Sequence, residues 1–316
     1  MIKMKLQKKH LSQAVGAIGT VLCIALFIHQ PSFPTPDKLF VFLLFVFMAY
    51  GEAWEMFKRL FPFVAVILVY ESFRSFADKL NTHVDYLLAP HADKLLFGNL
   101  PTVYLQNWLW KGHTSWYDYV LYIPYLFHFI IPLGLAILVW KTRVSEYTRG
   151  MVTYLVVAFG SFLTFFLFPA APPWLASQNH YIQPITRISS DVWAGLGLRD
   201  FPSVYNHIAP NPVAAIPSLH AAWAILFLIF VWKLYGRRWG LIAAIYPFLI
   251  FFGTIYEGEH YAFDVILGII YGVVGYLITP WLMAKWQIIW RKLKVRYSSS
   301  TKTASVSKPR LSKTKV

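Results

Sequence analysis

Long stretches of apolar residues constrain this chain more than any other feature of its sequence. A helix that crosses a bilayer needs about 20 mostly apolar residues, within a range of about 17 to 25. Eight segments meet this requirement, some marginally, at residues 12–29, 38–57, 61–77, 117–140, 150–168, 217–233, 239–256 and 261–283. Only 14% of the residues are charged, against about 25% in soluble domains. The sequence therefore predicts an all-α integral membrane protein with about eight transmembrane helices, and argues against a soluble domain.

The positive charge is concentrated at the two ends of the chain. Of the formal net charge of +15, four lysines within residues 3–9 and ten Lys or Arg residues within 285–315 account for nearly all. Lys and Arg in short loops tend to remain in the cytoplasm, and the basic connections at 58–59, 141–149 and 233–238 share one side if the N-terminus is cytoplasmic. We therefore expect both termini in the cytoplasm. Basic segments that flank apolar spans are typical of cytoplasmic ends that lie near anionic lipids. Binding of nucleic acid is therefore only a weak alternative explanation of the positive charge.

Two long segments then fall on the outer side of the membrane. Residues 78–116 carry Trp108, Trp110 and Trp116 among apolar residues, which suits a stretch lying in the headgroup layer. The segment at 169–216 opens with the sequence FPAAPPW at 168–174, whose prolines predict the end of a helix and a rigid extended path.

A first candidate motif, IPSLH at residues 216–220, begins the sixth expected span. Proline suits the first helical turn, Ser218 can cap it, and the free N–H groups of a helix start can bind an anion. His220 would lie beside that anion. Taken alone, an ordinary helix start followed by an interfacial histidine explains this motif better.

A second motif covers residues 254–264 at the entry to the last span. His260 and Asp264 are four residues apart, so on a helix they share one face, and the carboxylate can orient the imidazole as a nucleophile or base. Asp264 opens an uncharged run through Ile278, where a carboxylate is costly and therefore a functional candidate. The alternative is a surface His–Asp pair at a helix end.

The spacing of the two motifs strengthens the functional interpretation of both. His220 and His260 are 40 residues apart, which is the length of one span down, a turn and one span up. Both histidines should therefore reach the same outer face. Two histidines, a carboxylate and a helix N-terminus are the parts needed for phosphoryl transfer.

Taken together, the motifs resemble the integral-membrane branch of the type 2 phosphatidic acid phosphatase superfamily, and within it the inositol phosphorylceramide synthases. The likeness covers roughly residues 60–283. It is carried by FPAAPPW at 168–174, PSLH at 217–220, T-x-Y at 254–256 with HY-x-x-D at 260–264, and Y-x-x-HF at 125–129.

The resemblance implies specific roles for residues of both motifs. His260 would attack phosphorus, Asp264 would orient it, and His220 would protonate the leaving oxygen and then activate the acceptor. Ser218, Leu219 and Tyr256 would contact the substrate. No metal or other cofactor is implied.

The resemblance also implies a division of the chain. Residues 1–60 would form a basic N-terminal end with two accessory spans, and residues 61–283 a six-helix catalytic membrane domain. Residues 284–316 would form a basic cytoplasmic tail, which we expect to be disordered beyond residue 298.

The chain departs from the phosphatase signatures in its cations. It contains no Arg-Pro dipeptide, and Gly253-Thr254 stands where the family has Ser-Arg. Two phosphate-binding cations are therefore missing, which fits a phosphodiester with one negative charge better than a phosphomonoester with nearly two. Arg187 or Arg199 could replace them, or each could pair with a nearby aspartate.

Two further residues are secondary candidates. His128 lies near the middle of an expected span, where an ionisable group usually faces the interior of the helix bundle and has a functional role. The alternative is a neutral histidine that is hydrogen-bonded to a neighbouring carbonyl. Asp118 could contact a polyol headgroup or cap a helix. Glu52, Glu55 and Glu71 lie away from the motifs and receive no role.

The sequence thus leaves three hypotheses about function. The first is an enzyme that moves a phospho-headgroup, inositol phosphate or a similar polyol phosphate, from a phospholipid donor to a lipid alcohol on the outer leaflet. The second is hydrolysis of a lipid phosphate or polyprenyl pyrophosphate, with water as acceptor. The third is a non-enzymatic lipid transporter or scaffold. The oligomeric state is not predicted.

Overall fold

The computed structural model of the chain describes residues 2–198 and 211–306. Within these residues the chain is helical and forms no β-strand. Two isolated bridges join Ala170 to Asp85 and Ala214. The predicted all-α class is therefore confirmed.

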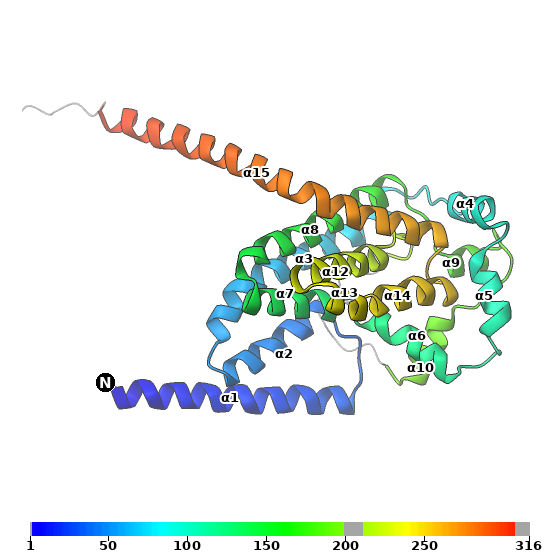
Figure 1. Cartoon of the computed structure of the whole chain (residues 1–316), viewed down its shortest axis with the longest axis horizontal. Coiled ribbons are helices and arrows are strands. Elements are labelled where there is room, and N and C mark those ends of the chain that lie inside the picture. The colour runs from blue at the N-terminus through cyan, green and yellow to red at the C-terminus, as the bar shows by residue number, and fades with distance from the viewer. Residues whose placement is uncertain (1, 199–210, 307–316) are drawn as a thin grey trace, which may run out of the picture.

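The N-terminal quarter of the chain forms three helices that run back and forth (Figure 1). They are α1 (Ile2–His29), α2 (Pro36–Ala49) and α3 (Ala53–Leu80). The expected span at 38–57 is broken, because Gly51 adopts a left-handed conformation with φ of +77°, which ends a helix at little cost for glycine. Residues 53–57 therefore belong to the next helix, and α2 has only 14 residues.

Four short helices gather at one end of the molecule (Figure 1). They are α4 (Leu88–Phe97), α5 (Pro101–Leu109), α9 (Pro173–Gln178) and α10 (Ile188–Gly195). The proline-rich segment that precedes α9 is extended only as far as Pro172. Pro173 instead begins a helix, as proline can in the first turn.

The expected span at 117–140 is a bent pair of helices. It consists of α6 (Trp116–Leu126) and α7 (Ile130–Thr142), with a bend of 53° between the two helix axes. Pro124 lies in the last turn of α6 and cannot donate a backbone hydrogen bond. His128 lies in the break between the two helices, and the structure thus places it at a bend instead of inside a continuous span.

Five more helices lie in the described part of the chain: α8 (Val144–Leu167), α12 (Leu219–Tyr235), α13 (Arg237–Ala243), α14 (Ile245–Tyr256) and α15 (Ala262–Val306). We expected disorder beyond residue 298, but α15 continues to Val306, and residues 307–316 lie outside the part that is described. No glycine or proline occurs between Pro280 and Val306 to end the helix.

Within the described part of the chain, five helices are long and apolar enough to cross a membrane, or six if α6 and α7 form one bent span. The 17-residue α12 is a further, shorter apolar helix. The protein is therefore a multi-pass membrane protein, and the number of eight spans stays a prediction.

Helices α12 and α15 approach each other closely through glycine. A Cβ atom on Gly268 would lie 2.3 Å from the carbonyl oxygen of Ser218, and one on Gly272 would lie 2.4 Å from Ile225. Ser218 also donates its backbone N–H to the carbonyl oxygen of Asp264, at 3.0 Å. The start of α12, which carries His220, is thus held against the start of α15.

Candidate active site

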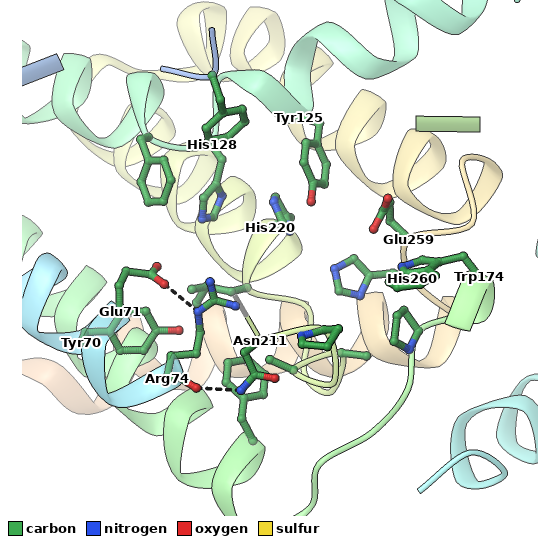
Figure 2. A pocket seen from close by; sticks show the side chains of 18 of the residues that line it. Tyr70, Glu71, Arg74, Tyr125, His128, Trp174, Asn211, His220, Glu259 and His260 are labelled. Atoms are coloured by element: carbon green, nitrogen blue, oxygen red, sulfur yellow. Dashed lines mark hydrogen bonds and ion pairs between the residues drawn. The ribbon is translucent and has the colours of Figure 1, made fainter. Parts of the chain in front are cut away.

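A cavity of about 220 Å³ opens among α3, the bend between α6 and α7, the start of α12 and the segment that precedes α15. Its lining contains three histidines together with two arginines and two glutamates (Figure 2). These side chains are Glu71, Arg74, His128, Arg187, His220, Glu259 and His260. Both motif histidines predicted from the sequence therefore face one cavity.

A tight turn before α15 presents His260. Gly258 adopts φ of +79°, and the carbonyl oxygen of Thr254 accepts the backbone N–H groups of Glu259 and His260, both at 3.0 Å. His260 is buried, with only 7% of its surface exposed. The turn thereby points the imidazole into the cavity (Figure 2).

Asp264 lies behind His260, as the spacing of the second motif predicts. Its Oδ2 atom is 3.5 Å from His260 Nδ1 and accepts the backbone N–H of Tyr261 at 3.0 Å. The pair does not share one face of a helix as we expected, because His260 precedes the first residue of α15. The carboxylate reaches the imidazole across the helix start, and it is fully buried.

His220 lies in the first turn of α12, opposite His260. The centroids of the two imidazole rings are 5.7 Å apart. The ring of His220 stacks on Tyr125 at 4.2 Å and lies 4.3 Å from His128, and His128 stacks in turn on Trp223 at 4.6 Å. Aromatic neighbours thus hold the imidazoles in place.

A cluster around Glu259 forms the side of the cavity next to His260. Arg187 donates from Nε to Glu259 Oε1 at 2.8 Å and from Nη2 to Oε2 at 3.4 Å. The guanidinium lies 4.1 Å from the centre of the Trp174 ring, and the hydroxyl of Ser189 also bonds to Glu259. Arg187 is therefore in the cavity as predicted, but it pairs with Glu259 instead of an aspartate. Arg199 lies outside the described residues.

A second pair, in α3, faces the cavity and was missed by the sequence analysis. Arg74 donates from Nε to Glu71 Oε2 at 2.6 Å, and Asn211 donates from Nδ2 to the carbonyl oxygen of Arg74 at 2.7 Å. A usable signal existed, because both charges fall inside the expected span at 61–77, where ionisable residues are functional candidates.

Of the remaining predicted site residues, one lines the cavity and the others lie outside its lining. Ser218 caps α12 by accepting the N–H of Ala221 at 3.3 Å, and Leu219 lines the cavity. Asp118 and Tyr256 do not line it, since the Tyr256 hydroxyl donates to Asp118 at 2.6 Å in a buried pair. The other oxygen of Asp118 accepts the N–H of Ser115 at 2.6 Å. The capping interpretation of Asp118 thus fits the structure, and a polyol contact does not.

One carboxylate from α4 stabilises the start of α15. Asp93, which is fully buried, accepts the backbone N–H groups of Ala262 and Phe263. Burial raises the pKa of its carboxyl to about 6, and the two backbone hydrogen bonds act in the opposite direction. The segment at 78–116 therefore contributes a structural contact next to the turn that carries His260.

The chemistry that this arrangement can support is transfer of a phosphoryl group. One imidazole has a carboxylate behind it and can act as a nucleophile, and a second imidazole across the cavity can act as acid or base. Two guanidinium groups can bind anionic oxygens.

Comparison with known proteins agrees with this chemistry. A family model described as PAP2 superfamily matches residues 91–278. A phosphoinositol dihydroceramide synthase of Bacteroides thetaiotaomicron is 30% identical over 257 residues, which cover 77% of this chain and 82% of that protein. No solved structure gives a significant match.

Proposed function

The chain belongs to the PAP2 superfamily, and from this we propose that it transfers a phospho-headgroup, inositol phosphate or a similar polyol phosphate, from a phospholipid to a lipid alcohol. That it is an enzyme of this superfamily, similar to inositol phosphorylceramide synthases, follows from the comparisons. The name of the Bacteroides relative supports phosphoinositol as the group moved and a ceramide-like alcohol as acceptor.

The observation that carries the proposal is the placement of His220 and His260 across one cavity, with Asp264 behind His260. In the first half-reaction, the free nitrogen of His260 forms a bond to phosphorus. The bond between phosphorus and the diacylglycerol oxygen breaks, and His220 gives its proton to that oxygen. The products are diacylglycerol and a phosphohistidine that carries the headgroup.

The second half-reaction restores both histidines. The acceptor hydroxyl gives its proton to His220, its oxygen bonds to phosphorus, and the bond between phosphorus and His260 breaks. Asp264 stabilises the positive charge that develops on the His260 imidazole when its bond to phosphorus forms, and this charge is lost when that bond breaks. Water in place of the lipid alcohol would make the same cycle a hydrolysis.

The charges that line the cavity favour a phosphodiester donor. Within the described residues each arginine of the lining has a glutamate beside it, Glu71 for Arg74 and Glu259 for Arg187. The lining is therefore close to neutral before the histidines titrate, which suits a phosphodiester with one negative charge better than a monoester with two. This supports transfer over the alternative, a lipid phosphate or pyrophosphate phosphatase.

We also place the cavity on the outer or lumenal side and both termini in the cytoplasm. The N-terminus and the far end of α15 lie at the same end of the molecule, away from α4, α5 and α9 (Figure 1). The basic residues of both termini support the cytoplasmic assignment for that end.

The test uses the purified full chain in detergent micelles, with phosphatidylinositol labelled on phosphorus and with ceramide present or absent. Label should move to a second lipid only when ceramide is present, and His260→Ala should abolish this movement. Release of water-soluble label regardless of acceptor would identify a phosphatase. Lipid turnover that is unchanged in His260→Ala would favour a transporter or scaffold.

A further inference from the structure

One cation of the cavity lies outside the part of the chain that defines the family. Arg74 belongs to α3, whereas the family model matches residues 91–278. Its side chain nevertheless lines the same cavity as His220 and His260, and Figure 2 shows it reaching toward the histidines from the opposite side to Trp174. We propose that Arg74 binds the phosphate under transfer and takes the place of the signature cations that this chain lacks. The inference rests on the proposed function.

The position of Arg74 is well defined. Nε donates to Glu71 at 2.6 Å, and only 3% of the Glu71 side chain is exposed. The backbone of Arg74 is held at its carbonyl oxygen by Asn211. A bond at Nε fixes the plane of the guanidinium, and a fixed plane suits the two-pronged contact that arginine makes with phosphate oxygens. Glu71 is thus the residue that positions Arg74.

Arg187, the other cation, is a weaker candidate for the same task. Trp174 covers one face of its guanidinium. Its side chain is 44% exposed, against 18% for Arg74. An interaction with an anion is screened more strongly near solvent than in a buried site. Arg74 is therefore the cation whose loss should weaken phosphate binding more.

The pairing with Glu71 also affects which phosphate is preferred. A guanidinium beside a buried carboxylate offers less net positive charge than a lone arginine. A phosphate with one negative charge is then bound well, while a second negative charge would meet the Glu71 carboxylate. Glu71 should therefore select phosphodiesters over phosphomonoesters.

Binding can be measured without turnover in the full-length His260→Ala protein in detergent. The probes are short-chain phosphatidylinositol, a phosphodiester, and short-chain phosphatidate, a phosphomonoester, each titrated by calorimetry. Arg74→Gln should weaken binding of phosphatidylinositol about tenfold to a hundredfold, as expected for a lost charge-assisted contact. Arg187→Gln is the matched control and should weaken it less.

Because Arg74→Gln leaves Glu71 buried without its cation, which can destabilise a fold, the double variant with Glu71→Gln is measured beside it. Unchanged affinity in both variants would overturn the role of Arg74. Glu71→Gln alone should improve binding of phosphatidate relative to phosphatidylinositol, and an equal change for both lipids would overturn the selection by charge.

These outcomes are separate from those of the transfer assay. If no headgroup transfer is found with any acceptor but phosphate binding still depends on Arg74, the proposed function fails and the inference stands. If transfer is found and binding is indifferent to Arg74, the inference fails and the proposed function stands.

Discussion

Asp93 and Phe263 are joined by a hydrogen bond across 170 residues of sequence, in which the Asp93 carboxylate accepts the backbone N–H of Phe263 at 2.8 Å. Its other oxygen accepts the N–H of Ala262 at 3.1 Å. The first N–H groups of a helix have no partner inside the helix, so Asp93 caps α15 from α4. This contact fixes the helix start that carries Asp264 next to His260.

The contribution of Asp93 to stability should depend on pH. Its pKa of about 6 lies above that of an exposed aspartate, about 3.9. At a pH between these two pKa values, folding is therefore accompanied by uptake of a proton at Asp93. The folded protein is then more stable with Asp93 protonated than with Asp93 ionised. The Tm of the wild type relative to Asp93→Asn should therefore fall as the pH rises from about 4 to about 7. A Tm difference that is constant over this range would contradict the prediction.

Adding a methyl group at Gly268 should disturb the site more than the fold. Its Cβ would collide with the carbonyl oxygen of Ser218, where the start of α12, which carries His220, packs against α15, which follows His260. Overpacking of this kind costs about 1–3 kcal/mol, and we expect Gly268→Ala to lower the transfer rate at least about tenfold.

The matched control is Gly160→Ala in α8. A Cβ atom there has nothing within 4 Å, so this variant should keep wild-type activity and a similar or slightly higher Tm. Equal transfer rates for the two variants would show that the close approach of α12 and α15 does not position the histidines.

Replacement of His220 should slow turnover strongly, because no other group is assigned to protonate the leaving oxygen. Loss of a general acid typically costs a factor on the order of 10²–10⁴, and we expect this for His220→Asn in initial rates with labelled donor. His128→Asn should have a smaller effect, since the ring of His220 faces His260 at 5.7 Å, whereas the ring of His128 packs on His220 and Trp223. A larger effect of His128→Asn would reverse the two assignments.

An apolar side chain in place of Glu257 should stabilise the protein. Glu257 is fully buried, and within the described residues neither carboxyl oxygen has a hydrogen-bond partner. Burial, with the nearby carboxylates of Glu259 and Asp118, raises the pKa of this carboxyl well above its usual range. Removing unpaired buried oxygens recovers about 1–3 kcal/mol, so Glu257→Met should raise the Tm and preserve activity. A lower Tm would mean that the carboxyl has a partner in the folded protein.

Local patterns in the sequence predicted the helical class and the placement of both motif histidines. Apolar runs identify helices wherever they occur, and a separation of one helical hairpin returns two residues to the same end of a bundle. Boundaries were less predictable, because Gly51 and the bend at His128 depend on backbone geometry that a hydrophobic run does not reveal.

The long-range contacts were not predictable from local patterns. Asp118 and Tyr256 pair with each other, Arg187 pairs with Glu259, and Arg74 reaches the cavity from α3. Each of these contacts depends on how distant helices pack, whereas spacing arguments apply only within one helix or one hairpin. The charges of Glu71 and Arg74 could be recognised in the sequence as unusual within an expected span, but the cavity that they face could not be predicted.

The contribution of α3 to the cavity means that the family segment is not a portable module. A hybrid that joins residues 91–278 to the N-terminal helices of a relative would keep both histidines. The side of the cavity that α3 lines would then come from the relative, with that protein's own residue in place of Arg74. Exchange of N-terminal helices is thus a route by which lipid preference can diverge in evolution, or be redesigned in the laboratory, while the reacting groups stay the same.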